Sequence, residues 1–213
     1  MSSGQHPDVT NEEADALKVL LFGSTGHIGA AVHERLKSTH DVVVASRSTG
    51  LPVDILDPDS IRTLFKKVGY VDAVVATVGS VPFKPFEHLQ RDDFLAALSN
   101  KTLGQVEIVR QGIPYITDGG SFTLTTGVVG REPIRTGAAA ALANGALEYF
   151  VPAAAVELPR GLRINAVSPT VLQGAPSYHS TFPGFIQAPA ATVAEAYVKS
   201  IEGAQTGRIY IVE

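Results

Sequence analysis

The sequence predicts an α/β fold in which helices cover both faces of a parallel sheet, and three observations support this prediction. Short apolar runs alternate along the chain with segments of helical periodicity, which is the pattern of successive strand–helix–strand units. The apolar runs are continuous rather than alternating, as in residues 72–76, and this is expected for strands buried on both faces. The first run also turns through three glycines directly into a helical pattern. In such a fold, ligands bind at the carboxyl ends of the strands.

The expected elements follow one another from residue 18 to residue 212. Strands are predicted at residues 18–22, 42–45, 71–76, 121–125, 162–167 and 208–212. Helices are predicted at residues 27–37, 58–67, 92–112, 136–158 and 191–202. Residues 1–16 are polar and lack periodicity, so they are expected to form a disordered tail, and residues 17–213 are expected to form a single domain.

Composition excludes several functional classes. With 213 residues and 45% hydrophobic content, the chain can bury a substantial core, while 18% charged residues and a net charge of −4 provide no basic surface for nucleic acid. We therefore expect no nucleic-acid partner. No apolar stretch is long enough to span a bilayer, so we expect no membrane partner and a cytoplasmic location. The chain has no cysteine, and its six histidines lack the spacing of metal ligands, so we expect no metal site.

The three glycines between the first strand and the first helix predict a loop that binds a dinucleotide. A side chain at Gly23 or Gly26 would obstruct a tight turn beside a pyrophosphate, and one at Gly29 would push the helix away from the strand. The free amides at the start of the helix would then face the anion. An ordinary glycine-rich turn is the alternative, but the strand before it and the helix after it favour nucleotide binding. The residues assigned to the cofactor here are Gly23, Ser24, Thr25, Gly26, His27, Ile28 and Gly29.

Between Lys18 and Val212, the chain resembles the short-chain dehydrogenase/reductase family. The glycine spacing is similar to that of the extended and atypical branches of the family. Residues 71–79 are similar to the strand that ends in the family's Asn-Ala-Gly segment, and residues 161–169 are close to its sixth strand. The resemblance implies a Rossmann-like doubly wound sheet of about seven strands in the order 3-2-1-4-5-6-7. The further residues that it places beside a nicotinamide cofactor are Thr77, Val78, Gly79, Pro169 and Thr170.

The end of the second predicted strand favours NADP(H) over NAD(H). The family places an acidic residue here to bond both ribose hydroxyls of NAD, whereas this chain has Ser46 and Arg47. A hydroxyl and a guanidinium suit the 2′-phosphate of NADP, because arginine forms charge-assisted hydrogen bonds with phosphate oxygens. A solvated arginine in a turn is the alternative. Asp54 is similar to the family aspartate beside the adenine amino group, and a turn or cap role is nearly as consistent with the sequence.

At the catalytic positions the chain departs from the family. The family donates a proton from a tyrosine whose pKa is lowered by a lysine four residues later, and the corresponding positions here are Ala140 and Asn144. No Tyr-x-x-x-Lys occurs in the chain. Asn144 could still bond a ribose hydroxyl through its amide, as a cofactor anchor. Thr126 (or Thr125) aligns with the family serine that binds the substrate oxygen, although a threonine that only ends a strand is the alternative.

Three other side chains could compensate for the missing pair. The family's Asn-x-x-Gly motif reads Lys101-Thr-Leu-Gly104 here, so the resemblance places an ammonium near the site, as an electrostatic stabiliser or, if desolvation lowers its pKa, as a proton donor. A surface lysine is the alternative. The stretch at about 170–190 resembles the family's substrate-covering loop and carries Tyr178 and His179, which loop closure could bring inward. A solvent-exposed loop is equally consistent with the sequence.

These observations lead to one main hypothesis and two alternatives. The main hypothesis is an NADP(H)-dependent oxidoreductase with an atypical active site, acting on a small organic carbonyl, imine or enone. Imines and enones need less acid assistance, so the loss of the tyrosine is compatible with them. The alternatives are a sensor or regulator that binds NADP without hydride transfer, and a non-redox enzyme such as a cyclase or isomerase. By resemblance, the helices at 92–112 and 136–158 would join subunits into a homodimer or homotetramer.

Overall fold

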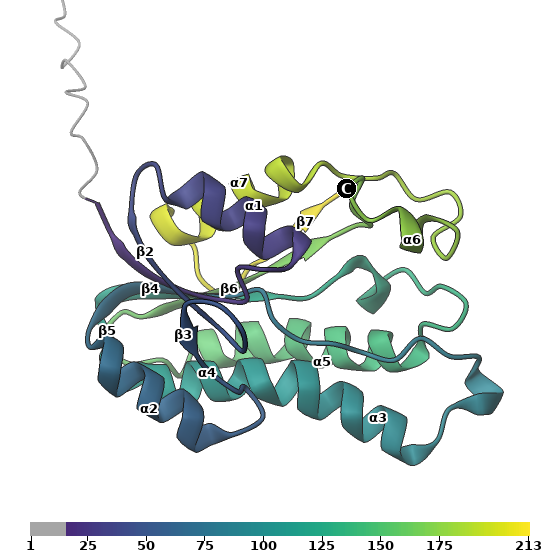
Figure 1. Ribbon diagram of the computed structural model, residues 1–213, viewed down its shortest axis with the longest axis horizontal. Coiled ribbons are helices and arrows are strands. Elements are labelled where there is room, and N and C mark those ends of the chain that lie inside the picture. Colours follow the sequence, from purple (N-terminus) through teal and green to yellow (C-terminus); the bar gives the residue numbers. More distant parts are fainter. Residues whose placement is uncertain (1–15) are drawn as a thin grey trace, which may run out of the picture.

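The computed structural model describes residues 16–213, which form a seven-stranded parallel sheet with helices on both faces (Figure 1). The strands are β1 (Lys18–Phe22), β2 (Asp41–Ser46), β3 (Leu51–Pro52), β4 (Val71–Ala76), β5 (Ile116–Thr125), β6 (Arg163–Pro169) and β7 (Ile209–Val212). Their order across the sheet is β3-β2-β1-β4-β5-β6-β7, so the predicted fold class and strand order are confirmed. The tail predicted for residues 1–16 lies outside the described residues, except for the exposed Ala16.

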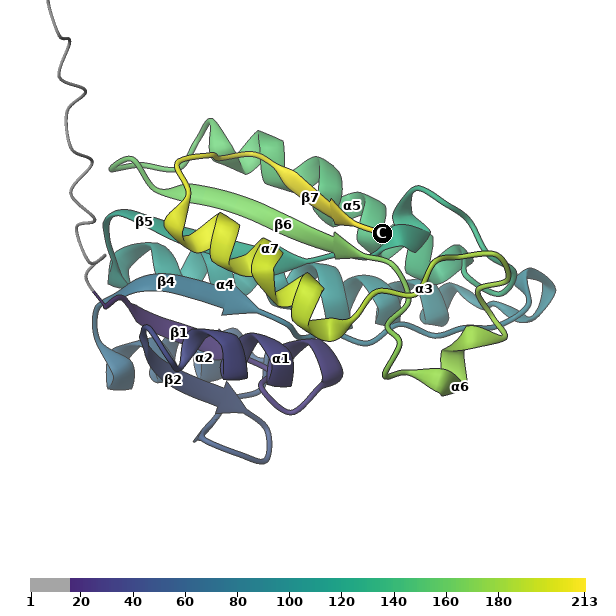
Figure 2. The ribbon, with the colours of Figure 1, turned by 90° about the horizontal axis from the view of Figure 1, so that it is seen from above.

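Two helical layers enclose the sheet (Figures 1 and 2). On one face α1 (His27–Leu36) packs beside α7 (Ala190–Glu202), and the other face is covered by α2 (Pro58–Val68), α4 (Gly104–Gly112) and α5 (Ala138–Ala155). The side chains of β1 alternate between two cores: Val19 and Leu21 pack beneath α1 and α7, whereas Leu20 and Phe22 pack beneath the other layer. Burial on both faces explains why the strands appear in the sequence as continuous apolar runs.

Local sequence signals define the ends of α2. Asp57 is its N-cap, and the Asp57 carboxylate accepts a hydrogen bond of 2.9 Å from the backbone N–H of Asp59. Pro58 occupies the first helical position, where a backbone N–H would have no partner in the helix. Gly69 follows the last residue with a φ of 74°, in the left-handed region that favours glycine. These signals explain why the prediction of 58–67 agrees with the structure to within one residue at each end.

The single helix predicted at 92–112 is instead three consecutive helical segments. α3 (Arg91–Ala97) passes into a π-helical segment, η2 (Leu98–Leu103), and this continues into α4. The wider turn changes which side chains face the sheet, and apolar periodicity alone does not reveal it. Within η2, the Thr102 hydroxyl donates a hydrogen bond of 3.0 Å to the backbone oxygen of Ala143 and so links the segment to α5. π-Helical turns occur frequently at functional sites, and this one carries Lys101.

The carboxyl ends of the strands lie at one end of the molecule, where the longer connections also gather (Figure 2). The connection after β4 contains the short helix η1 (Phe86–His88), the one after β5 contains η4 (Val128–Gly130), and the one after β6 contains α6 (Pro176–His179). A further short helix, η3 (Ile113–Tyr115), lies between α4 and β5 at the opposite end of the strands. The arrangement brings residues that are far apart in the sequence to a common edge of the sheet.

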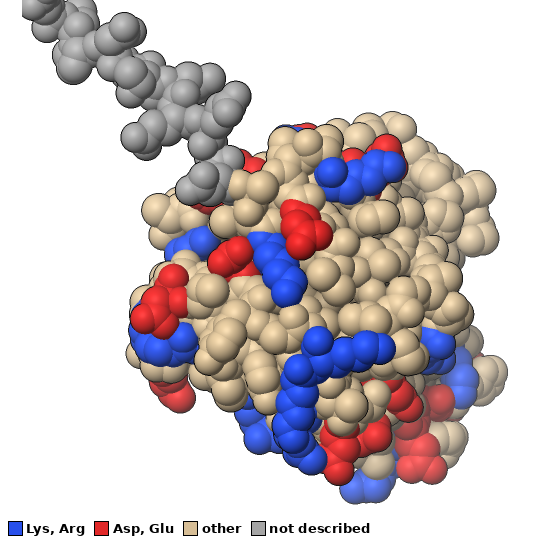
Figure 3. All heavy atoms as spheres, turned by 60° about the vertical axis from the view of Figure 1, so that its left-hand side comes forward, with Lys and Arg blue, Asp and Glu red and all other residues tan. Residues whose placement is uncertain are grey.

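Charged side chains are distributed over the surface rather than gathered by sign. On the face drawn in Figure 3, Lys and Arg side chains lie interspersed with Asp and Glu, and uncharged residues make up much of the surface. Among the described residues, no helix combines the length and the apolar character that crossing a lipid bilayer requires.

Candidate active site

The glycine loop after β1 is shaped by close backbone contacts. Gly23 has a φ of 90°, and a Cβ there would lie 2.6 Å from Cγ1 of Val78. A Cβ on Gly29 would lie 2.0 Å from the backbone oxygen of Gly23, so only glycine lets α1 start this close to the strand. A Cβ on Gly26 would meet no atom within 4 Å, which leaves open space over the middle of the loop.

The start of α1 borders this open space. Gly26 is the N-cap and supplies no side-chain cap, so the first amides of the helix are free to bind an anion. Thr25 and His27 are exposed and Ser24 is partly accessible, whereas Ile28 packs against the core beneath α7. The cradle of free amides and the open face of Gly26 fit the pyrophosphate of a dinucleotide.

The segment after β4, which includes Thr77, and helix α4, which carries Gln105, support the glycine loop from the other side. The Thr77 hydroxyl lies 2.9 Å from the backbone oxygen of Phe22 and 3.0 Å from that of Gly23. A Cβ on Gly29 would lie 2.6 Å from Oγ1 of Thr77, so Thr77 adds to the crowding caused by the Gly23 oxygen. Gln105 of α4 is fully buried and was not identified from the sequence. Its Nε2 donates to the backbone oxygens of Val78 (3.2 Å) and Thr125 (2.9 Å), and its Oε1 accepts from the Thr125 N–H (2.8 Å). Gln105 therefore fixes Val78 relative to the end of β5.

The turn after β2 separates the two residues predicted for the 2′-phosphate. The Ser46 hydroxyl is engaged within the turn, because it donates to the backbone oxygen of Thr49 (2.7 Å) and accepts from the Thr49 N–H (2.8 Å). Arg47 is exposed, and its guanidinium has no recorded hydrogen bond or ion pair with the rest of residues 16–213. Asp54 is exposed, and its Oδ1 accepts a hydrogen bond of 3.0 Å from the Leu56 N–H, as in a turn.

Lys101 reaches from η2 to the end of β5. Its Nζ donates a hydrogen bond of 3.2 Å to the backbone oxygen of Thr126. Its stem packs on Gly79, where an added Cβ would lie 2.8 Å from Cγ of Lys101 and where the φ of 122° also favours glycine. Burial lowers the pKa of Lys101 to about 8, against a raising influence from Glu148. The residue is neither fully exposed nor fully enclosed.

Asn144 faces the same region from α5. Its Oδ1 is buried and has no hydrogen-bond partner within residues 16–213, so a hydroxyl donor would satisfy it. A Cβ on Gly127 would lie 3.5 Å from Nδ2 of Asn144, which places the glycine immediately beside the amide. An unpartnered buried acceptor at this edge of the sheet fits the ribose of a nicotinamide nucleotide.

Thr126 belongs to a network that the sequence did not reveal. Its hydroxyl donates a hydrogen bond of 3.0 Å to Oε1 of Glu148, the same atom that accepts from Nη1 of Arg131 (2.6 Å) and from the Ser168 hydroxyl (2.8 Å). Nη1 of Arg131 also donates to Oγ of Ser168 at 2.8 Å. The available sequence signal is Glu148, because no other acidic or basic residue occurs in α5.

The position of the family tyrosine is apolar. Ala140 is buried in a cluster with Val128 and Val129 of η4, and Phe182 and Phe185 of the connection after β6 pack against this cluster. The two phenylalanine rings meet edge to face, with their centroids 5.4 Å apart and their planes at 88° to each other. The side chains of the cluster around Ala140 are thus all apolar and include no proton donor.

The connection after β6 carries the remaining predicted residues. Pro169 ends β6, and the Thr170 hydroxyl donates a hydrogen bond of 3.0 Å to the backbone oxygen of Ile186, which closes the base of the connection. His179 Nε2 lies 2.9 Å from the backbone oxygen of Leu172 in the same connection. Tyr178 is 47% exposed and its ring lies 6.2 Å from that of Phe83, in the connection after β4. Within residues 16–213, neither side chain forms a hydrogen bond with Lys101 or Asn144.

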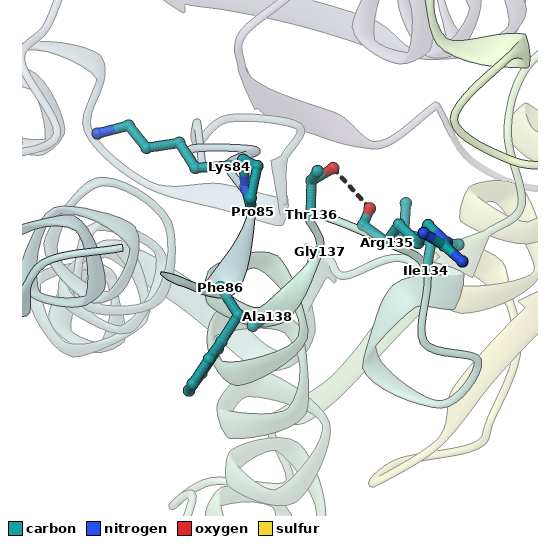
Figure 4. A pocket seen from close by; sticks show the side chains of 8 residues that line it. All are labelled: Lys84, Pro85, Phe86, Ile134, Arg135, Thr136, Gly137 and Ala138. Carbon is teal, nitrogen blue, oxygen red and sulfur yellow. Dashed lines mark hydrogen bonds between the residues drawn. The ribbon is translucent and has the colours of Figure 1, made fainter. Parts of the chain in front are cut away.

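A cavity of about 420 Å³ lies at the outer rim, between the connection after β4 and the start of α5. Its lining residues are Lys84, Pro85, Phe86, Ile134, Arg135, Thr136, Gly137 and Ala138. Figure 4 shows that the side chains of Lys84, Phe86 and Arg135 point in different directions rather than into a common space. Ile134 also packs on the cluster around Ala140, so the cavity continues the apolar side of the site toward solvent.

Comparison with known proteins identifies the family of the chain. The family model described as enoyl-(acyl carrier protein) reductase matches residues 27–204. The curated hydroxynaphthalene reductase-like protein Arp2 of Metarhizium brunneum is 28% identical over 130 residues, which cover 58% of this chain and 49% of that protein. The chain thus spans about half the length of the curated relatives it matches.

Solved structures match over a larger share of the chain. The protein lin1944 from Listeria innocua is 46% identical, with a TM-score of 0.91 over 93% of this chain and 100% of the other. A small-chain dehydrogenase in complex with NADPH is 27% identical, with a TM-score of 0.83 over 93% and 97% of the two chains. The chain belongs to the short-chain dehydrogenases/reductases, an oxidoreductase family that uses nicotinamide cofactors.

Proposed function

We propose that the chain is an NADP(H)-dependent oxidoreductase that reduces a small organic carbonyl, imine or enone. The observation that carries this proposal is Lys101, an ammonium of lowered pKa at the carboxyl end of β5, in a chain whose glycine loop leaves room for a dinucleotide. Bound NADPH would supply the hydride. The residues of the chain would hold the cofactor, orient the substrate and stabilise the charge left on its oxygen or nitrogen.

Cofactor binding would use the backbone more than side chains. The amides at the start of α1 would bind the pyrophosphate over Gly26, and Asn144 would accept a hydrogen bond from a ribose hydroxyl. Arg47 is exposed at the end of β2 and would bind the 2′-phosphate, while Ser46 would act by shaping the turn. The NADPH complex of a relative supports the choice of NADP(H).

Lys101 would act as an electrostatic stabiliser. With a pKa of about 8 the group is mostly protonated at neutral pH, and its bond to Thr126 uses one of three N–H donors. A positive charge in a partly desolvated site stabilises developing negative charge far better than it would in water. The Thr126 hydroxyl is held by Glu148, so Thr126 would contribute mainly by seating Lys101. Tyr178 and His179 would complete the site only after movement of their connection.

A second candidate function is binding of NADP without hydride transfer. The observation that favours it is the apolar cluster at Ala140, where Phe182 and Phe185 pack over the position from which the family donates its proton. Such a protein would respond to the ratio of oxidised to reduced cofactor and would need no acid. An enzyme that catalyses a non-redox reaction in the same pocket would likewise bind NADPH without oxidising it.

One experiment separates these functions. NADPH and NADH are titrated by nucleotide fluorescence, and loss of the reduced nicotinamide absorbance is followed with panels of carbonyls, imines and enones. The oxidoreductase predicts turnover, and Lys101→Met should then reduce kcat by about 100-fold with little change in NADPH affinity. The matched control is Lys66→Met, at an exposed position of α2, which should leave both unchanged. Binding without turnover of any panel would favour the second candidate, and unchanged kcat in Lys101→Met would contradict the role of Lys101.

We also propose that the chain forms a homodimer or homotetramer through α5. Leu142 and Tyr149 of α5 and Val156, the C-cap residue of this helix, recur at seven-residue spacing, and they are 44%, 84% and 85% exposed. Residues at this spacing lie on one side of a helix, so they form an apolar stripe that a second copy would cover. Sedimentation velocity should show an oligomer for the wild type and a monomer for Tyr149→Glu. A monomeric wild type at micromolar concentration would contradict the proposal.

A further inference from the structure

We propose that Glu148 is a positioning residue for Lys101. Together with Arg131, Glu148 forms a charged network that keeps the amino group of Lys101 protonated. The same network fixes the end of β5, to which the Lys101 Nζ is hydrogen-bonded. The proposal rests on the proposed function only for the use that catalysis makes of Lys101. The network itself is a property of the protein without cofactor.

The geometry of Glu148 carries the first step. Three donors from three parts of the chain meet at one oxygen of this side chain: Thr126 at the end of β5, Arg131 after η4 and Ser168 at the end of β6. The Glu148 side chain is only 11% exposed, and that of Arg131 27%. The carboxylate therefore joins α5 to the carboxyl ends of two neighbouring strands.

Stability alone does not account for this arrangement. Removing two charges from water costs free energy that their attraction repays only partly, so an apolar pair of similar volume is often as stable or more stable. Apart from Asn144, the buried residues of α5 are apolar, including Leu147 and Val151, which flank Glu148 on the same helix. Nη2 of Arg131 is also buried without a partner among the described residues, which adds to the cost.

Thr126 connects the network to Lys101. Its hydroxyl donates to Glu148 and its backbone oxygen accepts from Nζ of Lys101, so a single residue receives both interactions. Lys101 and Glu148 make no direct ion pair, but the negative charge of Glu148 raises the pKa of Lys101 against the effect of burial. Movement of Glu148 would therefore displace Thr126, which binds the Lys101 ammonium, and would also move the negative charge that favours the ammonium.

The charges around Lys101 determine in which direction each substitution should change its protonation. Gly79 from the connection after β4 and Asn144 from α5 are neutral, while Glu148 contributes one negative charge and Arg131 one positive charge. Removing Glu148 would leave two cations near each other, which favours the neutral amine at Lys101. Removing Arg131 would leave the attraction of Glu148 uncompensated, which favours the ammonium. The two changes should therefore act in opposite directions.

The test is a pH titration of Lys101 by NMR in cofactor-free protein labelled with ¹³C and ¹⁵N at lysine, with the resonance assigned by its loss in Lys101→Met. Glu148→Gln should lower the titration midpoint by about one pH unit, and Arg131→Gln should raise it by a smaller amount. Glu148→Asp keeps the charge and should restore most of the wild-type midpoint. Glu132→Gln removes an exposed carboxylate from the adjacent position and should leave the midpoint unchanged.

Shifts of Glu148→Gln and Arg131→Gln in the same direction, or no shift in either, would overturn the inference, because a purely structural role predicts no opposition of sign. Thermal melts identify any variant that fails to fold. If Glu148→Gln is that variant, an upward shift of the midpoint in Arg131→Gln still supports the inference, and a downward shift or no shift overturns it. Turnover does not enter this measurement. The network can therefore be upheld while the oxidoreductase proposal fails, or overturned while turnover is observed.

Discussion

The two halves of the carboxyl edge of the sheet are built by different means. In the half formed by β1, β2 and β4, the decisive contacts involve glycines and backbone atoms, such as Gly29 against the backbone oxygen of Gly23. In the half formed by β5 and β6, side chains from several elements determine the site, as in the convergence of Thr126, Arg131 and Ser168 on Glu148. Backbone contacts require only that side chains be absent, whereas side-chain contacts depend on residue identity at each position.

This difference allows a chain to keep the family fold, which the first half carries, and we propose that the catalytic side chains of the second half differ from those of the family. By its resemblance to the family, the chain has Asn144 of α5 at the position of the family lysine and Lys101 of the neighbouring segment η2 at the position of the family asparagine. We propose that the amide and the ammonium have exchanged helices. The exchange keeps one cation and one amide at the edge of the sheet, but it changes which helix the charge comes from.

The largest expected effect is that of Gly29→Ala in the half built from backbone contacts. Its methyl group would lie 2.0 Å from the backbone oxygen of Gly23 and 2.6 Å from Oγ1 of Thr77, so α1 must move. We expect the free energy of unfolding to fall by about 2 to 3 kcal/mol and NADPH affinity to fall by roughly 100-fold. Urea denaturation and fluorescence titration measure these effects.

Gly26→Ala is the control for this prediction, because its methyl group would meet no atom within 4 Å. Its free energy of unfolding should change by less than about 1 kcal/mol, while NADPH affinity should still fall. Equal destabilisation by the two substitutions would show that the loop is not constrained by close contact.

Arg47→Ala should have the next largest effect, a loss of affinity for NADPH but not for NADH. Loss of charge-assisted hydrogen bonds should weaken NADPH binding by about 10- to 30-fold, whereas NADH has no 2′-phosphate and should bind as before. Ser46→Ala is the contrast, because its hydroxyl holds the turn through Thr49 and its loss should affect both nucleotides alike. An equal effect of Arg47→Ala on NADPH and NADH would remove the basis for NADP preference.

Lys101 should make stability depend on pH in a predictable direction. Its pKa is lowered from 10.5 to about 8 in the folded protein, so between these values the unfolded chain holds a proton that the folded chain has released. Stability therefore rises with pH across this window. From pH 8 to 10, the wild type should gain about 1 to 2 kcal/mol relative to Lys101→Met in parallel urea titrations. A constant difference between the two proteins would show that the lysine titrates normally.

The elements that the sequence predicted well are those with local signals. Strand and helix alternation, the cap at Asp57 and the glycines of the first turn all act over a few residues. The two-residue strand β3 is too short to show periodicity. β5 begins at Ile116 rather than at residue 121, because a register shift against β4 accommodates the turn-like residues 117–120. The π-helical turn of η2 likewise has no apolar signature.

At the site, the same distinction separates what could be predicted. The location of Lys101 followed from its register with a family motif, but its packing on Gly79 joins residues 22 positions apart. Arg131 and Ser168, which meet at Glu148, are 37 positions apart in the sequence. Such contacts depend on strand order and helix placement together, and no local pattern encodes them.

The smallest expected effects are those of Tyr178→Phe and His179→Gln. Tyr178→Phe removes only the hydroxyl and keeps the ring contact with Phe83, so kcat should change by less than about 3-fold if Lys101 carries the electrostatic role. His179→Gln removes the contact with the backbone oxygen of Leu172 and should raise KM by a few-fold through loosening of the connection. Steady-state kinetics with the substrate found in the panel measures both. A 100-fold loss of kcat in Tyr178→Phe would mean that Tyr178, in the connection after β6, is the proton donor. The part of the site that depends on side chains would then include this connection as well as α5 and η2.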